Sequence, residues 1–204
     1  MTDRRIRRED YLTKLSPDNC VLVPVDYLTG FLPGIRTIDP QTYQHNVTAF
    51  CRLGQIFAPR LPTLILGDEG GFRGQFMPQV EEYLSHAPRF ARHTPSGWHA
   101  EGFADALKAT GRRKVVMGGI SLDNCVLQTA LDVMAAGYEV YVLPDVSGTD
   151  SLLVEPAAMM RLGQAGAVMT NWVSLASELM GDWQSPEGEA VGALYKTSSK
   201  WGGG

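Results

Sequence analysis

Residues 114–145 read "KVVMGGISLDNCVLQTALDVMAAGYEVYVLPD" and contain the clearest pattern of secondary structure in the chain. The stretch opens with a short apolar run, passes two glycines and a polar turn, and continues with apolar residues spaced three and four apart, as on one face of a helix. A second apolar run, rich in valine and tyrosine, closes the stretch. The order strand, turn, helix, strand is typical of two parallel strands joined by a crossover helix, and it predicts an α/β protein.

The same alternation extends to both sides of this stretch. Three more apolar runs, bounded by Gly, Pro or Asp, are typical of strands buried on both faces, at residues 20–26, 62–67 and 166–170. Segments with helical spacing lie at residues 40–58, 77–87, 99–111, 155–166 and 171–183. We therefore predict a three-layer α/β/α, Rossmann-like sandwich with a mostly parallel six-stranded sheet. The domain is expected at residues 17–184, between an N-terminal arm (1–16) and a C-terminal tail (185–204).

The composition narrows the function classes. The 204 residues are 44% hydrophobic and 20% charged, with a net charge of -4, which fits one globular domain rather than a nucleic-acid-binding protein. No apolar stretch reaches the roughly 18 to 20 residues of a membrane-spanning helix, and the first residues lack the apolar core of a secretory signal. We therefore expect a cytoplasmic protein that binds neither nucleic acid nor membrane.

Polar side chains follow several of the expected strands. In an open parallel sheet, ligands bind beyond the carboxyl ends of the strands. This rule selects Asp26, the Asp68–Glu69 pair, the Gly118–Cys125 turn and Asp145. The Asp68–Glu69 pair is also typical of a solvated acidic loop. Asp26 ends a strand that is expected to neighbour the central one, so its carboxylate is expected to face the turn that holds Cys125.

The three cysteines, Cys20, Cys51 and Cys125, are scattered, so we expect no disulfide framework, zinc knuckle or paired redox motif. Cys20 opens an apolar strand and Cys51 lies on an apolar helix face, which favours a buried structural thiol in each case. Cys125 falls in the first turn of a helix expected to begin near Leu122 or Asp123. Unpaired N–H groups and the helix dipole favour a thiolate there, and the thiolate is the nucleophilic form.

The quoted stretch belongs to a wider set of motifs. Over residues 17–184 the chain resembles the isochorismatase-like cysteine hydrolases, particularly their YcaC-like branch. The other segments that carry the resemblance are "VLVPVDYLTGFL" (21–32), "LPTLILG" (61–67), "APRFAR" (87–92) and "RLGQAGAVMTNWVSLASEL" (161–179). The strand, turn, cysteine, helix motif followed by "AAGYEVYVLPDVSGT" is the specific part of this pattern.

The resemblance implies a role for several residues. Cys125 matches the family's nucleophile, Asp26 its general base, and Arg92 its basic member, a lysine or an arginine. Because arginine does not exchange protons, proton transfer would fall on Asp26 alone. The resemblance also implies a cis peptide between Ile120 and Ser121, with the amides of Ser121 and Cys125 as an oxyanion hole.

Several positions leave alternatives open. His93 and His99 lie near Arg92 and are alternative cationic or proton-transfer groups. Leu28 stands where the family often has glutamine or asparagine, and Leu122 where it often has threonine. Both changes remove polar groups near the expected site, and they favour either an apolar substrate or a loss of activity.

We predict a cysteine-dependent hydrolase that cleaves the C–N bond of a small amide through a thioester on Cys125 and forms a homo-oligomer. The alternative is a catalytically impaired member of the family that acts as a small-molecule-binding or oligomeric scaffold. No cofactor or catalytic metal is expected, because the chain lacks both a G-x-G-x-x-G fingerprint and an Asp-x-His motif after the second strand. The residues expected to line the substrate pocket are Leu28, Phe31, Phe72 and Trp98.

Overall fold

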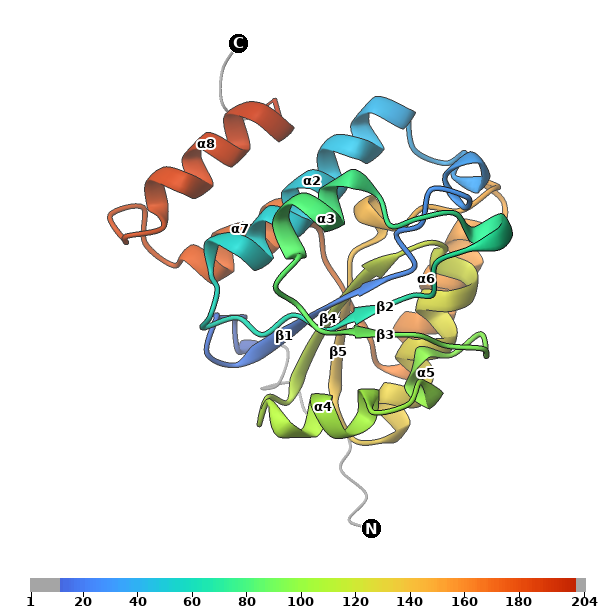
Figure 1. The fold of residues 1–204 in the computed structure, drawn as a ribbon. Helices are drawn as coiled ribbons and strands as arrows, with labels where there is room; N and C mark the ends of the chain where they lie inside the picture. The colour runs from blue at the N-terminus through green and yellow to red at the C-terminus, as the bar shows by residue number, and fades with distance from the viewer. Residues whose placement is uncertain (1–11, 201–204) are drawn as a thin grey trace.

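The computed structural model describes residues 12–200, and its sheet confirms the predicted fold class. Six strands pair in parallel in the order β3-β2-β1-β4-β5-β6 (Figure 1). The longest pairing joins β1 to β4, with Val25 opposite Gly119 at the carboxyl end. The strands are β1 (Cys20–Val25), β2 (Ile65–Leu66), β3 (Arg89–Phe90), β4 (Lys114–Gly119), β5 (Glu139–Val142) and β6 (Val168–Met169).

Helices cover both faces of the sheet, as Figure 1 shows. One layer contains α2 (Pro40–Ile56), α3 (Pro78–Leu84), α7 (Trp172–Met180) and α8 (Gly188–Ser198). The other contains α4 (Phe103–Ala109), α5 (Leu127–Ala135) and α6 (Val154–Ala165). Successive side chains of β1 alternate between these layers, so both faces of the strand are buried and its sequence is a continuous apolar run. No helix between residues 12 and 200 is long and apolar enough to cross a lipid bilayer.

None of the five apolar runs in the sequence corresponds to strand β3. It has only two residues, Arg89 and Phe90, and neither is buried. An edge strand pairs on one side only and needs no second buried face, so it leaves no apolar run. Arg89 lies over the Phe76 ring, 4.8 Å from the ring centroid, and pairs with Glu81 at 2.8 Å.

The prediction that residues 185–204 form a tail is wrong for most of these residues. Residues 188–198 form α8, which packs on α2 and α7 through Val191, Leu194 and Tyr195. These side chains recur at three and four spacing, so α8 buries one face and exposes the other. The predicted N-terminal arm also needs correction at its end, because Leu15 belongs to the core and its amide donates to Glu178. Residues 1–11 and 201–204 lie outside the described part.

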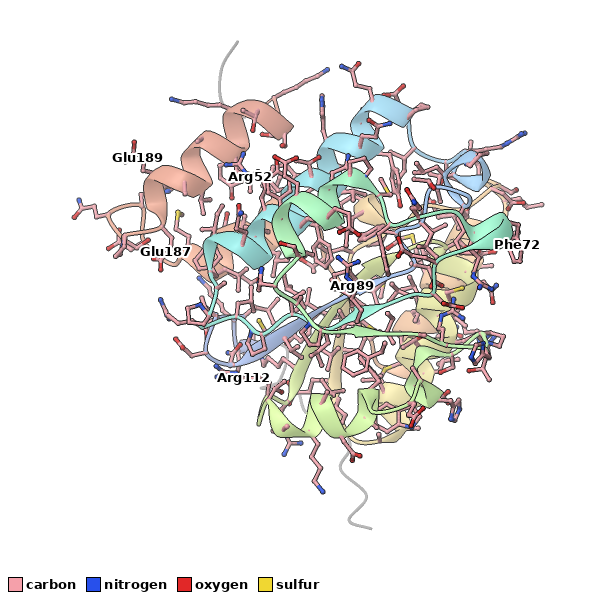
Figure 2. All side chains as sticks on the ribbon, viewed as in Figure 1. Arg52, Phe72, Arg89, Arg112, Glu187 and Glu189 are labelled. Carbon is pink, nitrogen blue, oxygen red and sulfur yellow. The ribbon has the colours of Figure 1, made fainter. Side chains whose placement is uncertain are left out.

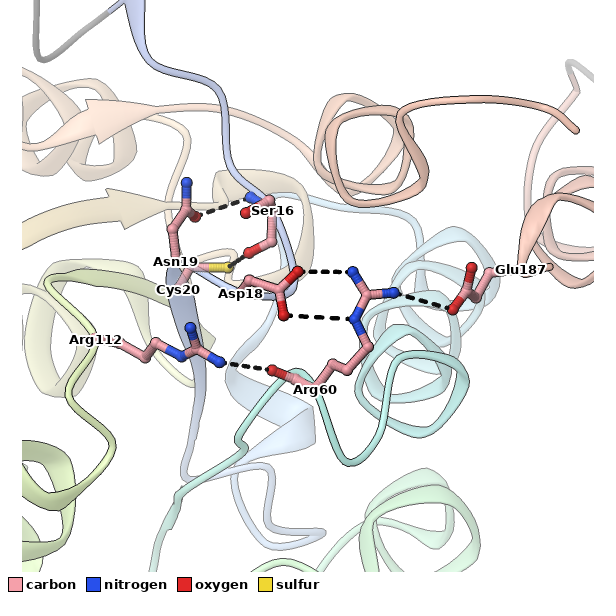
Figure 3. Close-up of polar contacts among 7 residues, drawn as sticks. All are labelled: Ser16, Asp18, Asn19, Cys20, Arg60, Arg112 and Glu187. Atoms are coloured by element: carbon pink, nitrogen blue, oxygen red, sulfur yellow. Dashed lines mark hydrogen bonds and ion pairs between the residues drawn. The ribbon is translucent and has the colours of Figure 1, made fainter. Parts of the chain in front are cut away.

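Arg60 connects the two ends of the described chain (Figure 3). Its guanidinium pairs with Asp18 at 2.7 Å and with Glu187 at 3.4 Å, and its carbonyl accepts from Arg112 at 3.1 Å. Arg60 and Asp18 are exposed, so these pairs contribute little to stability. The cluster adjoins Cys20, the first residue of β1, and therefore marks the amino end of the sheet, away from Asp26.

Candidate active site

A glycine allows the carboxyl ends of the central strands to meet. Gly119 pairs with Val25, and a Cβ atom on Gly119 would overlap the carbonyl oxygen of Val25. Only a residue without a side chain permits this close approach. Asp26, which follows Val25, therefore lies beside the turn that leads from β4 to Cys125.

Asp26 leaves β1 in the left-handed backbone conformation, with φ of 51°. It is the one non-glycine residue with positive φ in the described chain. Aspartate tolerates this conformation better than most residues, although the cost is still roughly 1 to 2 kcal/mol. The Asp26 amide donates to the Leu66 carbonyl at 2.8 Å, and the residue is 2% exposed. The backbone turn and this hydrogen bond hold the carboxylate at the end of β1.

Cys125 lies in η4 (Leu122–Val126), a π-helical turn, and the regular helix α5 begins only at Leu127. The sequence predicts an α-helix from residue 122 or 123, so the wider first turn is a difference between expectation and structure. Single π turns of this kind are frequent at functional sites. The peptide bond between Ile120 and Ser121 is cis, at the position that the resemblance implies.

Arg92 contacts both the acid and the thiol. It follows the edge strand β3, and its Nη2 atom forms an ion pair with Asp26 Oδ2 and donates a hydrogen bond to Cys125 Sγ at 2.8 Å. Nη1 of the same guanidinium donates to the Thr94 carbonyl. The side chains of Arg92 and Asp26 are 11% and 2% exposed, so water screens the pair little. The Arg92 guanidinium therefore places positive charge against both the carboxylate and the sulfur.

Thr129 links the Arg92 loop to the helix that follows Cys125. Its Oγ1 atom accepts from the Gly97 amide at 2.8 Å and donates to the Cys125 carbonyl at 2.7 Å. Thr129 is fully buried on α5, one turn after Cys125. Thr129, a positioning residue, is not among the residues predicted from the sequence. The available signal was a hydroxyl on the apolar face of the helix, where a polar group needs hydrogen-bond partners.

Cys125 opens onto two cavities. The Asp26 cavity has a volume of about 340 Å³, and its walls include Asp26, Asp68, Phe72, Arg73, Arg92 and His93. The Ser121 cavity has a volume of about 330 Å³, and its walls include Ile35, Ile120, Ser121, Asp123 and Asp150. Phe31, Asn124 and Cys125 line both. Cys125 therefore lies between two spaces of similar size, although only 9% of the residue is exposed.

The four residues expected to line the substrate pocket divide into two groups. Phe31 and Phe72 line the Asp26 cavity, and Phe72 projects from the surface with 79% of its area exposed (Figure 2). Leu28 and Trp98 line neither cavity, which corrects the expectation. Leu28 is fully buried beside Phe76, because the chain turns inward after Asp26. Trp98 packs edge-on against Phe103 in the opposite layer.

The alternatives to Arg92 lie apart from the acid and the thiol. His93 is exposed on the wall of the Asp26 cavity, and His99 pairs with Asp132 at 3.3 Å. Within the described chain, neither histidine forms a hydrogen bond or ion pair with Asp26 or Cys125, although His93 lines the same cavity. Asp68 is paired with Arg73 at 2.8 Å. Between residues 12 and 200, no group of three or more His, Cys, Asp or Glu side chains is arranged to hold a metal ion.

The other two cysteines are packed in the core. Cys20 donates to the Ser16 carbonyl at 3.1 Å (Figure 3), and burial raises the pKa of its thiol to about 12. Cys51 is fully buried on α2, and burial raises the pKa of its thiol further. Both groups are therefore uncharged thiols at neutral pH, and neither lines one of the two cavities at Cys125.

Asp145, at the end of β5, serves the fold rather than either cavity. Its Oδ2 accepts from the Trp172 amide at the start of α7 at 3.1 Å, while its Oδ1 is buried without a hydrogen-bond partner. Burial raises the pKa of this carboxyl from 3.8 to about 6. The folded state therefore binds a proton more tightly than the unfolded chain does, and this carboxyl's contribution to stability falls as pH rises from about 4 to about 6.

Asp145→Asn is expected to remove this pH dependence. Between pH 4 and pH 7, the free energy of unfolding of the variant should gain about 2 kcal/mol relative to the unchanged protein, since each pKa unit corresponds to about 1.4 kcal/mol and part of the effect lies below pH 4. Urea unfolding at both pH values measures the difference. The control is Asp105→Asn on the exposed side of α4. Parallel stability curves for Asp145→Asn and the unchanged protein would contradict the assignment.

The sequence matches a known family of proteins. Residues 65–174, more than half of the chain, match the family model described as the isochorismatase domain. The chain belongs to the isochorismatase family. This confirms the family predicted from the motifs around Cys125. "Probable hydrolase YcaC" of Escherichia coli (strain K12) is 32% identical over 174 residues, which cover 84% of this chain and 83% of that protein.

Solved structures of isochorismatase-family proteins share the fold. YcaC from Pseudomonas aeruginosa, with hexane-2,5-diol and covalent acrylamide, is 32% identical and has a TM-score of 0.85, covering 91% of this chain and 92% of that one. The YcaC gene product of Escherichia coli, described as an octameric hydrolase of unknown specificity, is 30% identical with a TM-score of 0.86. That match covers 91% of each chain.

Proposed function

We propose that this isochorismatase-family chain is a cysteine-dependent hydrolase that cleaves the C–N bond of a small amide in the cytoplasm. Cys125 is the nucleophile, Asp26 carries protons, and Arg92 is a fixed cation. The observation that carries the proposal is the single guanidinium nitrogen of Arg92 that contacts both the Asp26 carboxylate and the Cys125 sulfur. This contact supports a nucleophile that is ionised before the substrate arrives.

The geometry supports a two-step reaction. The Cys125 sulfur attacks the amide carbon, the C–N bond breaks, and the leaving nitrogen takes a proton from Asp26, which has received it from the thiol. Water then attacks the thioester and gives a proton to Asp26, and the sulfur leaves. The products are a carboxylic acid and an amine. In the tetrahedral states, the amides of Ser121 and Cys125 would bind the negative oxygen.

Two findings on relatives are consistent with this chemistry. YcaC from Pseudomonas aeruginosa is described with covalent acrylamide, a small amide that reacts with nucleophiles. The Escherichia coli YcaC gene product is described as a hydrolase. In this chain, Leu28 and Leu122 are fully buried and line neither cavity, so the apolar residues that motivated a scaffold role are part of the core.

Alkylation with iodoacetamide tests the proposal. At pH 6, Cys125 is expected to react about tenfold or more faster than a small free thiol, because the thiolate is the reactive species. Cys20 and Cys51 should stay unlabelled in the folded protein and serve as internal controls. Peptide mass spectrometry assigns each label. Equal and slow labelling of all three cysteines would favour the scaffold function instead.

A homo-oligomer is part of the proposal. The YcaC gene product of Escherichia coli is described as octameric. In this chain, the segment that leads into α6 exposes large apolar side chains, since Leu152 is 73% and Leu153 is 85% exposed. Exposed apolar neighbours of this kind favour a contact between copies. We expect them to lie in a subunit interface.

The double variant Leu152→Glu, Leu153→Glu is expected to lower the mass of the assembly, because it places charge in an apolar contact. Size-exclusion chromatography with light scattering measures the mass. Met160→Glu, at an exposed position further along α6, shows whether the effect is confined to the two leucines. If the protein without substitutions is oligomeric and the double variant has the same mass, the subunit interface lies elsewhere.

A further inference from the structure

The groups around Cys125 are divided between its two cavities. Asp26 and Arg92 line the Asp26 cavity and not the Ser121 cavity. Ile120 and Ser121 line the Ser121 cavity and not the Asp26 cavity. Asp26, the proposed proton carrier, and Ser121, which supplies one of the two expected oxyanion donors, therefore lie on different sides of Cys125.

This division determines where each part of an amide substrate must lie, provided that the proposed function holds. Asp26 gives a proton to the leaving nitrogen and later takes one from the attacking water, so the nitrogen and the water both occupy the Asp26 cavity. The acyl group stays bonded to the Cys125 sulfur between these steps. It therefore occupies the Ser121 cavity, the other space that Cys125 lines.

The walls of the Ser121 cavity show what kind of acyl group fits. Phe31, Ile35 and Ile120 supply apolar surface next to the thiol, and the carboxylates of Asp123 and Asp150 supply negative charge. No lysine, arginine or histidine is among its lining residues. Asp150 forms no ion pair or side-chain hydrogen bond within residues 12–200, and Asp123 accepts only a hydroxyl hydrogen bond, from Ser121 at 2.5 Å.

The Asp26 cavity differs in its charge balance. Its two carboxylates, Asp26 and Asp68, are each paired with an arginine, Arg92 and Arg73 respectively. The unpaired negative charge at the thiol is therefore concentrated on the acyl side. A cationic group there gains attraction, and a carboxylate is repelled.

We propose that the acyl part of the substrate has an apolar stem and a cationic end, the stem packing on Phe31, Ile35 and Ile120 and the cation lying near Asp123 and Asp150. The substrate class is the amides of small carboxylic acids that carry an ammonium group. Asp123 and Asp150 are the residues that select for this charge.

Two charged thiol reagents test the charge preference without a known substrate. Trimethylammonioethyl and sulfonatoethyl methanethiosulfonate differ in the sign of their charge. In each reaction the Cys125 thiolate attacks the divalent sulfur of the reagent. A disulfide forms, and methanesulfinate leaves. Each rate is divided by the rate with a small free thiol, which removes the intrinsic difference between the reagents. Mass spectrometry assigns the rates to Cys125.

The double variant Asp123→Asn, Asp150→Asn is expected to lower the normalised cation-to-anion rate ratio by about tenfold or more, within the usual range of electrostatic effects on association. Because Arg92 remains in both proteins, its preference for anions cancels in this comparison. Asp105→Asn, which removes one exposed negative charge outside both cavities, should leave the ratio unchanged. The same ratio in the double variant and the unchanged protein would overturn the proposal.

Turnover of matched amides gives a second measurement. Pentanamide, its terminal-amino derivative and its terminal-carboxylate derivative have similar length and different charge. We expect kcat/KM to be highest for the ammonium compound and lowest for the carboxylate, and the double variant to reduce this spread.

Labelling with a neutral reagent, methyl methanethiosulfonate, distinguishes a failure of the proposed substrate class from a failure of the proposed hydrolase function. Fast labelling of Cys125 without charge selection would refute the substrate class alone, whereas slow labelling would refute the hydrolase function with it.

Discussion

Replacing Cys125 by serine is expected to lower amide turnover by about 10³-fold to 10⁶-fold and to abolish the covalent intermediate. A hydroxyl is far less acidic than a thiol, so serine cannot supply the proposed thiolate, while the shape of the site is nearly kept. Intact-mass spectrometry after incubation with acrylamide tests whether residue 125 is the reactive nucleophile, since a thiolate adds readily to the acrylamide double bond and a serine hydroxyl does not.

The matched control for this variant is Cys51→Ala. Cys51 is buried on α2 and lines neither cavity, so its removal is expected to lower stability slightly and to leave the mass increase in place. Thermal unfolding checks that both variants are folded. If the mass increase persists in Cys125→Ser and disappears in Cys51→Ala, the reactive cysteine is Cys51, and the proposed role of Cys125 is wrong.

Asp26→Asn is expected to produce the second large effect, a loss of about 10²-fold to 10⁴-fold in kcat, the usual contribution of a general acid or base. Asparagine has the shape of aspartate and also tolerates the left-handed backbone of this position, where φ is 51°. The variant therefore removes the proton carrier without forcing the chain into a new conformation.

An activated ester separates the two roles of Asp26. The leaving group of p-nitrophenyl acetate needs no proton, so Asp26→Asn should still form the acetyl-enzyme and release a burst of nitrophenolate. Hydrolysis of the thioester needs a base, so acetyl-Cys125 should accumulate, and intact-mass spectrometry detects it. Asp105→Asn is the control with equal loss of charge. Rapid deacylation in Asp26→Asn would show that another group activates the water.

Much of the fold was predictable because its signals are local. The buried strands β1 and β4 have apolar residues on both faces, and the helices between them repeat at three and four spacing. The tail was predicted wrongly because α8 contains Gly188, Gly192 and several polar residues, and it becomes a stable helix only when Val191 and Leu194 pack on α2 and α7.

The pocket residues were less predictable, because the direction of a side chain depends on distant packing. Leu28 and Trp98 are close in sequence to Asp26 and Arg92, yet both point into packed layers. Phe31 and Phe72 come from two separate loops and meet with ring centroids 6.0 Å apart. Thr129 has a role only because the Gly97 amide reaches it from another segment.

The sequence alone determined that a thiol follows a buried central strand at the start of a helix, and that an aspartate ends a strand of the same kind. These features depend on neighbours within a few residues, which a single sequence displays directly. Packing between distant segments places one guanidinium, from Arg92 just after the short edge strand β3, in contact with both Asp26 and Cys125. The tertiary structure also decided that Cys125 lies between two cavities of unequal charge, because their walls come from segments that meet only after the sheet has formed.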